Sequence, residues 1–205
     1  MRARTAVLCS VADQGVAALT NILVLLAAAR LSTVTDFARF SAVYLVFTVL
    51  LGVSGAYTGQ PLVLKRGAGE ETRGACRSAV AFTLLASACL GALLAAVCAL
   101  VPGDTARALM MLGLVLPVVL GQDAARYAFS TLQRPHLALL ADLLRLGGVL
   151  GALFAQDYGA SPARLIAVWG LSALPALLLS AALVHRATGS LPGEPKLPLE
   201  STSGI

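Results

Sequence analysis

The chain has 205 residues, of which 58% are hydrophobic and only 12% are charged, and its mean hydropathy is +0.85. A soluble domain carries about 25% charged residues, so this composition excludes a soluble globular protein and indicates an integral membrane protein. The net charge of +5 is spread over many short loops and forms no cluster of the kind that lines a nucleic-acid groove. We therefore expect no nucleic-acid partner.

The length leaves room for about six membrane helices, because each crossing needs about 20 apolar residues. Long runs rich in Leu and Ala favour helices over a barrel, whose segments alternate over about ten residues. We predict an all-α, multi-pass transmembrane bundle over residues 1–186 and a disordered cytoplasmic tail over 187–205, which is rich in Pro and Gly. The expected helices are Val7–Arg30, Phe37–Leu64, Ser78–Val101, Ala106–Gln122 with an extension towards Leu132, Leu137–Ala155 and Pro162–Val184.

The first apolar run is expected to stay in the protein as a membrane helix. It is longer than the roughly 7 to 15 residues of a signal-peptide core, and it contains Asp13, Gln14 and Asn21. Gln14 and Asn21 are seven residues apart, so we expect them near one face that looks into the bundle. That face could line a polar cavity for a hydroxyl-rich substrate, or it could serve interhelical hydrogen bonding, with Asp13 near the cytoplasmic interface.

Turn and proline signals mark the later helices. Thr35 and Asp36 predict the cap of the second helix, Pro61 predicts a kink near its end, and Pro117 predicts one within the fourth. Small residues four apart predict close helix contacts, or they reflect a chain that is simply rich in Gly and Ala. They are Gly55 and Gly59, Gly147 and Gly151, and the third-helix series Ser87, Gly91, Ala95 and Ala99.

The distribution of Lys and Arg predicts that both termini are cytoplasmic. Six crossings place both ends on one side, and that side holds ten basic residues against four on the other, as the positive-inside rule requires of the cytoplasmic side. The ten are Arg2, Arg4, Lys65, Arg66, Arg73, Arg77, Arg126, Arg134, Arg186 and Lys196, the four are Arg30, Arg39, Arg107 and Arg164, and Arg145 is counted as intramembrane.

The segment from Gln122 to Arg145 concentrates charge between two apolar runs. Ionised groups in hydrocarbon are unfavourable by at least ~2.5 kcal/mol, so they usually face protein or a water-filled cavity. Asp123 and Arg126 are three residues apart, as are Asp142 and Arg145, close enough for each to pair along its helix. Such pairs could be structural, or the four side chains could face a central cavity and contact an anionic head group. With Asp13, Gln14, Asn21 and Gln122, they are our candidate substrate-path residues.

The sequence contains no motif for catalysis or for a cofactor. Phosphate-binding loops, HExxH and GxSxG are absent, and the four cysteines form no CxxC pair and lie in or beside apolar runs. We expect no enzyme activity, no cofactor and no metal site, and we interpret the cysteines as small packing residues.

Several short segments together resemble the opening half of bacterial polysaccharide exporters, the Wzx-like lipid-linked oligosaccharide flippases of the MATE-related (MOP) superfamily. They are ADQGVAALTNILVLLAAARL, TDFARFSAVYLVF, GQPLVLK and QDAARYAFSTLQRPHLALLADLLR. The matching positions are Asp13, Gln14, Thr20, Asn21, Asp36, Phe37, Phe40, Gln60, Pro61, Gln122, Asp123, Arg126, Tyr127, Pro135 and Asp142.

The resemblance covers about residues 7 to 186, and members of that superfamily typically have twelve to fourteen helices in two related halves. It implies movement of a lipid-linked saccharide across the cytoplasmic membrane by alternating access, driven by an ion or proton gradient. This chain has room for one half, so the expected partners are membrane lipid, the lipid-linked saccharide and either a second copy or a second half-transporter. The alternatives are a non-transporting scaffold that assembles with glycan-synthesis enzymes and an exporter of small cationic compounds.

Overall fold

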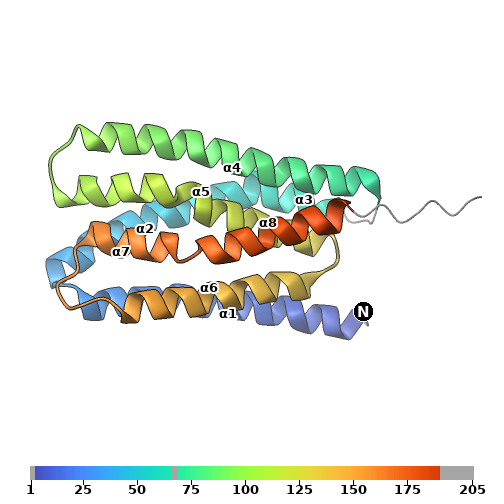
Figure 1. Ribbon diagram of the computed structural model, residues 1–205, viewed down its shortest axis with the longest axis horizontal. Coiled ribbons are helices and arrows are strands. Elements are labelled where there is room, and N and C mark those ends of the chain that lie inside the picture. The colour runs from blue at the N-terminus through green and yellow to red at the C-terminus, as the bar shows by residue number, and fades with distance from the viewer. Residues whose placement is uncertain (1–2, 66–68, 190–205) are drawn as a thin grey trace, which may run out of the picture.

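The computed structural model describes residues 3–65 and 69–189, and these residues form an all-α bundle (Figure 1). Six stretches are long and apolar enough to cross a membrane, so the predicted multi-pass helical architecture is confirmed. The elements are α1 (Ala3–Leu31), α2 (Val34–Ser54), the π-helical turn η1 (Gly55–Gly59), α3 (Gln60–Leu64), α4 (Glu70–Ala99), α5 (Asp104–Thr131), α6 (Pro135–Phe154), α7 (Pro162–Leu171) and α8 (Leu174–Gly189).

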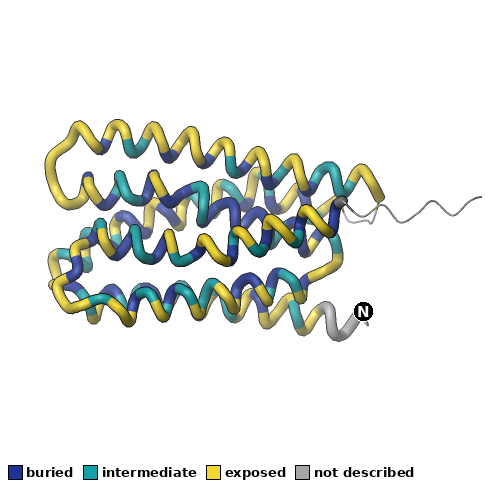
Figure 2. The backbone as a smooth tube through the Cα atoms, viewed as in Figure 1, coloured by how far each residue is buried: buried dark blue, intermediate teal, exposed yellow. Residues whose placement is uncertain are grey.

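Helix α5 is the centre of the bundle. The share of buried residues in its most apolar 18-residue window is 67%, against 22% to 39% in the other five spans. It packs against α2, α4, α6, α7 and α8, while α1 lies mainly along α6 (Figures 1 and 2). Because the middle of α5 is surrounded by protein, its buried polar residues Gln122 and Asp123 face other helices instead of lipid.

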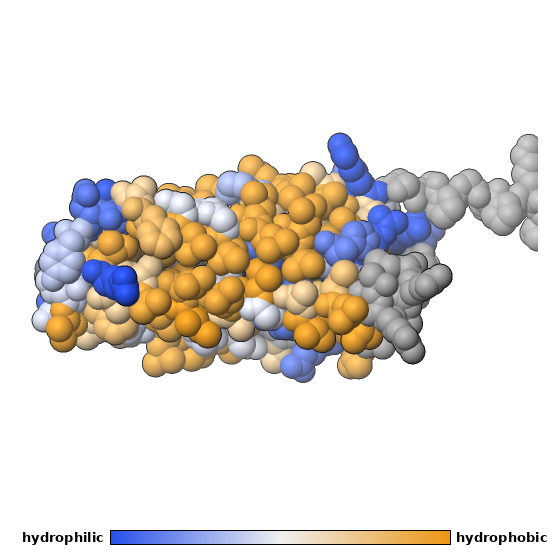
Figure 3. All heavy atoms as spheres, turned by 90° about the horizontal axis from the view of Figure 1, so that it is seen from below, coloured by the Kyte–Doolittle hydropathy of each residue, from blue (hydrophilic) through white to orange (hydrophobic). Residues whose placement is uncertain are grey.

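The outer surface suits a bilayer. Large apolar side chains on α1, α2 and α4 are exposed, Val11, Leu45 and Leu93 each by more than 60%. In the face drawn in Figure 3 apolar side chains cover the middle, and hydrophilic side chains gather towards both ends. Both described ends of the chain lie at the same end of the bundle (Figure 1), as six crossings require; the cytoplasmic location of that end remains a prediction.

The starts of α2 and α4 differ from the sequence expectation in informative ways. Thr33 caps α2, because its Oγ1 accepts a hydrogen bond from the Asp36 amide at 3.2 Å; the cap predicted at Thr35 and Asp36 is wrong. Helix α4 begins at Glu70, eight residues before the predicted start at Ser78. Glu70 and Glu71 occupy its first turn, where carboxylates stabilise the helix dipole.

The last predicted span is divided into α7 and α8. Pro175 has no amide hydrogen and its ring clashes with a carbonyl one turn earlier, so a continuous helix is disfavoured here. Helix α8 then continues to Gly189, which places residues 187–189 in a helix and not in the predicted tail. The remainder of that tail, 190–205, lies outside the described residues.

Proline acts differently in the second and fourth spans. Pro117 lies inside α5 without ending it, and α5 runs on to Thr131, in agreement with the predicted extension. Before Pro61 the helix widens into η1, where the Gln60 amide donates to the Gly55 carbonyl five residues back. The disturbance predicted at Pro61 thus takes the form of a π-helical turn, a feature often found at functional sites.

Some of the predicted small-residue contacts are present. Gly91 of α4 and Gly113 of α5 lie backbone to backbone, and a Cβ on either would collide with the other's carbonyl oxygen. Gly55 and Gly59 lie against the Tyr127 ring. Gly147 and Gly151 have nothing within 4 Å of a built Cβ, so their predicted close contact is wrong.

Candidate functional site

The polar residues of α1, α5 and α6 meet around Arg126. This side chain is 14% exposed, and its nitrogens face three carboxylates from three helices. Nη2 donates to Asp13 Oδ2 at 2.9 Å, Nη1 donates to Asp123 Oδ1 at 3.2 Å, and Nε lies 3.0 Å from Asp142 Oδ2 in an ion pair without a hydrogen bond. The Asp123–Arg126 pair predicted from the three-residue spacing is therefore present.

Gln122 joins this centre to a second arginine. It is fully buried; its amide nitrogen donates to Asp142 Oδ1 at 2.8 Å, and its amide oxygen accepts from Arg145 Nη1 at 2.7 Å. No direct ion pair joins Asp142 and Arg145 among the described residues. The pair expected within α6 is thus replaced by an amide from α5, because Asp142 faces Arg126 instead.

Helix α1 contributes through a different face from the one predicted. Asp13 and Thr20 are buried and seven residues apart, whereas Gln14 is exposed. Asn21 is half-buried, and its Oδ1 accepts a hydrogen bond from the Tyr44 hydroxyl at 3.0 Å. The expectation that Gln14 and Asn21 share an inward face is wrong, because the inward stripe of α1 is one residue away from Gln14.

An aromatic group adjoins the polar residues on their inner side. Tyr44 packs against Phe40, Phe47 and Trp169, with ring centroids 5.3 to 5.8 Å apart. Trp169 is fully buried, so it is a packing residue of the bundle core. The charged centre is therefore closed on this side by tightly packed rings.

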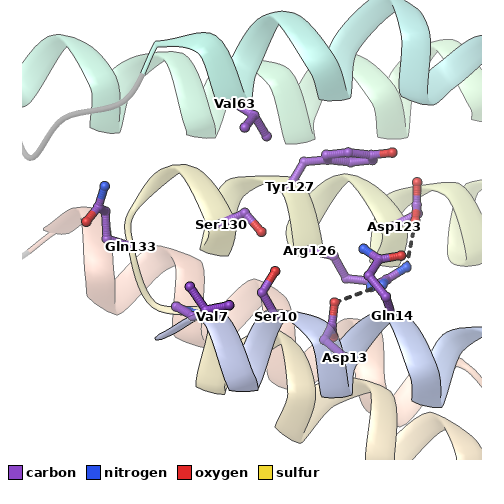
Figure 4. A pocket seen from close by; sticks show the side chains of 11 residues that line it. Val7, Ser10, Asp13, Gln14, Val63, Asp123, Arg126, Tyr127, Ser130 and Gln133 are labelled. Atoms are coloured by element: carbon purple, nitrogen blue, oxygen red, sulfur yellow. Dashed lines mark hydrogen bonds and ion pairs between the residues drawn. The ribbon is translucent and has the colours of Figure 1, made fainter. Parts of the chain in front are cut away.

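A pocket of about 440 Å³ lies over the charged centre, between α1 and α3 with α5 as its floor (Figure 4). Exposed uncharged polar groups line much of it: Ser10, Gln14, Ser130 and Gln133. The other lining residues are Val7, Asp13, Val63, Asp123, Arg126, Tyr127 and Pro135.

A smaller cavity of about 30 Å³ lies deeper, bordered by Asn21, Asp142 and Arg145 among others. That volume holds about one water molecule. Asp123 and Arg126 line both the pocket and this cavity. They therefore form the partition between the open pocket and the interior.

The turn from α5 to α6 shapes the mouth of the pocket. The Arg134 amide donates to the Phe129 carbonyl at 2.9 Å and the Gln133 amide donates to the Ser130 carbonyl at 3.1 Å, the two bonds of a Schellman motif. This motif needs a left-handed residue, usually Gly, and Gln133 has a φ of 58°. Gln133 thus holds an unfavourable backbone conformation at the pocket.

All eight predicted path residues line one of the two cavities or bond to residues that do: Asp13, Gln14, Asn21, Gln122, Asp123, Arg126, Asp142 and Arg145. Gln14 does so as an exposed residue of the open pocket. Sequence reasoning missed Tyr44, Ser10, Ser130 and Gln133, because a lone tyrosine or serine in an apolar run carries no spacing signal. Across residues 3–65 and 69–189 no group of three His, Cys, Asp or Glu side chains is arranged to hold a metal ion.

Comparisons with protein families, with curated proteins and with solved structures find no match to this chain.

Proposed function

We propose that this chain is a half-transporter that moves a lipid-linked saccharide across the cytoplasmic membrane by alternating access. The observation that carries the proposal is the charged centre of Arg126, buried among membrane-spanning helices and lying directly beneath a pocket of about 440 Å³. Ionisable groups at such a place typically mark a substrate or ion pathway. The segment resemblance to polysaccharide exporters supplies the substrate class.

The position of the pocket supports a half-sized unit. It lies between α1 and α3 (Figure 4), and it opens to the surface of the described chain, because its lining residues Ser10, Gln14, Ser130 and Gln133 are exposed. In repeat-built transporters the substrate site lies at the interface between two halves. A second copy of this chain, or a different half, would close the pocket from the open side.

The proposal is tested by export of the saccharide in cells. Arg126→Ala and Asp142→Ala should abolish export while the protein still inserts into the membrane. Arg39→Ala is the matched control, because Arg39 also pairs with two carboxylates, those of Asp36 and Asp104, but it lies away from the pocket. Normal export in both test variants would reject the site.

A non-transporting scaffold is the second candidate, and the internal pairing of the centre favours it. Gln122 has partners on both amide atoms, and Arg126 has three carboxylate partners, so the polar groups could serve packing alone. A scaffold should keep its function when Asp142→Asn is combined with Arg145→Gln, since neutral side chains can still hydrogen-bond through Gln122. A transporter should lose its function in the same double variant.

A further inference from the structure

Among the described residues, the wall of the pocket offers a ligand many uncharged hydrogen-bonding groups and no available cation. The four exposed polar residues of its wall carry two hydroxyls and two amides. Arg126 is the one cationic side chain among the lining residues, and each of its three nitrogens already faces a carboxylate. A phosphate or sugar carboxylate entering here would have to compete with three aspartates for that guanidinium.

The charges behind the wall also disfavour an anion. The connected centre contains three carboxylates, those of Asp13, Asp123 and Asp142, against two guanidinium groups, those of Arg126 and Arg145, so acidic groups outnumber basic ones by one. Asp13 is 4% exposed, and its Oδ1 has no hydrogen-bond partner. In a site partly screened from water, an uncompensated charge acts strongly on a nearby ligand.

We propose that this pocket receives the uncharged, hydroxyl-bearing part of its ligand and rejects anionic groups, so that any phosphate of the ligand binds elsewhere. The inference rests on the proposed function for the identity of the ligand as a saccharide. It replaces the idea that the candidate path residues contact an anionic head group. A sugar ring fits the wall chemistry, because its hydroxyls both donate and accept hydrogen bonds, and so do the hydroxyls and amides of serine and glutamine.

The charge preference can be measured with a cysteine in the pocket. Ser10→Cys is introduced after the four native cysteines are replaced by alanine, and the purified full chain is labelled with size-matched cationic and anionic thiosulfonates. The rate at which each reagent labels the protein is divided by the rate at which the same reagent reacts with free cysteine. We expect the cationic reagent to react about tenfold faster, which corresponds to about 1.4 kcal/mol.

Two variants and one control assign the cause of the preference. Asp13→Asn should lower the ratio of rates, whereas Asp36→Asn, whose carboxylate pairs with Arg39 away from the pocket, should leave it unchanged. Gln14→Lys adds a cation at an exposed pocket position and should reverse the preference, and an exposed substitution is compatible with folding. A ratio at or below one in the parent protein overturns the inference.

The class of ligand is tested by whether added saccharides protect the cysteine of Ser10→Cys from labelling. A neutral disaccharide should block labelling by an uncharged reagent at about tenfold lower concentration than the corresponding uronic acid, again about 1.4 kcal/mol. Equal or stronger protection by the acid overturns the inference, even if the cells export saccharide. If the cationic reagent is preferred but no saccharide protects the cysteine, a saccharide is not the ligand of this pocket. Failure of the proposed transport function is detected independently, by the export assay in cells.

Discussion

Arg126 Nη2 and Asp13 Oδ2 lie 2.9 Å apart although 113 residues separate them in sequence. This ion pair ties α1 to the central helix, and it does so next to the pocket instead of deep in the aromatic core. The remaining nitrogens of Arg126 hold a carboxylate of α5 and one of α6. One guanidinium therefore fixes three helices at the place where a ligand would enter.

Removal of Arg126 should destabilise the bundle strongly. Arg126→Ala leaves three carboxylates, each at most 10% exposed in its side chain, and breaking a buried ion pair by removing one partner typically destabilises by about 3–5 kcal/mol. Asp13→Asn should destabilise less, because an amide oxygen can still accept from Nη2. Thermal unfolding in detergent measures both, and an Arg126→Ala protein as stable as the parent contradicts the expected burial of this centre.

Gln122 should matter for the arrangement of the two arginines. Gln122→Leu keeps the apolar volume but removes one partner each from Asp142 and Arg145, and an unsatisfied buried group is unfavourable by about 1–3 kcal/mol or more when charged. Gln14→Leu is the control, since Gln14 is exposed on α1. We expect Gln122→Leu to lower the unfolding temperature more than Gln14→Leu does. If the two variants lower it equally, Gln122 does not bridge the helices.

Glycine-to-alanine variants distinguish glycines that lie at a close helix contact from glycines that only have the four-residue spacing. Gly91→Ala and Gly113→Ala should each destabilise by about 1–3 kcal/mol, because the added methyl forces α4 and α5 apart. Gly147→Ala should be neutral or stabilising by about 0.5–1 kcal/mol, because it meets open space and Ala favours a helix more than Gly. If all three behave alike in detergent unfolding, the close approach of Gly91 and Gly113 is wrong.

The fold follows from sequence to the extent that local rules decide it. Apolar run length fixes the number of spans, and the clustering of Asp123, Arg126 and Asp142 marks the centre, since charges in hydrocarbon must find partners. The partner of each charge was not predictable. Asp142 is spaced to pair with Arg145 on its own helix, yet it accepts a hydrogen bond from Gln122 and forms an ion pair with Arg126, both of α5. The reason is that helix rotation and packing between distant segments decide which residue it meets.

Helix rotation also explains why the predictions for the Gly147/Gly151 contact and for the inward face of α1 are wrong. A four-residue spacing is equally present in Gly147/Gly151 and in Gly55/Gly59, but only the second pair faces a neighbouring side chain. Gln14 and Asp13 differ by one position, which rotates a side chain by roughly 100° about the helix. Which of the two faces inward depends on how α1 lies along α6, a tertiary contact that no local pattern contains.

Gln133 gives a test of backbone strain at the pocket. A left-handed conformation is unfavourable by about 1–2 kcal/mol for residues other than Gly, so Gln133→Gly should stabilise the protein by about 1 kcal/mol. Arg134→Gly, at an ordinary φ of −121°, should not stabilise it. Unfolding temperatures of the two variants provide the measurement, and a destabilised Gln133→Gly would show that the side chain contributes more than the strain removes.

The orientation of the bundle in the membrane can be tested at its two ends. Glu71 and Thr105 are exposed and lie in the first turns of α4 and α5, at opposite ends of one helical hairpin (Figure 1). With the native cysteines replaced, Thr105→Cys should react with a membrane-impermeant maleimide added to intact cells, and Glu71→Cys should react only after the cells are opened. The reason is that Lys65, Arg73 and Arg77 flank the Glu71 end, and basic loops are retained in the cytoplasm. Reversed labelling would place the mouth of the pocket, at Gln133 and Ser10, on the outer side, and the ligand would then have to enter from outside.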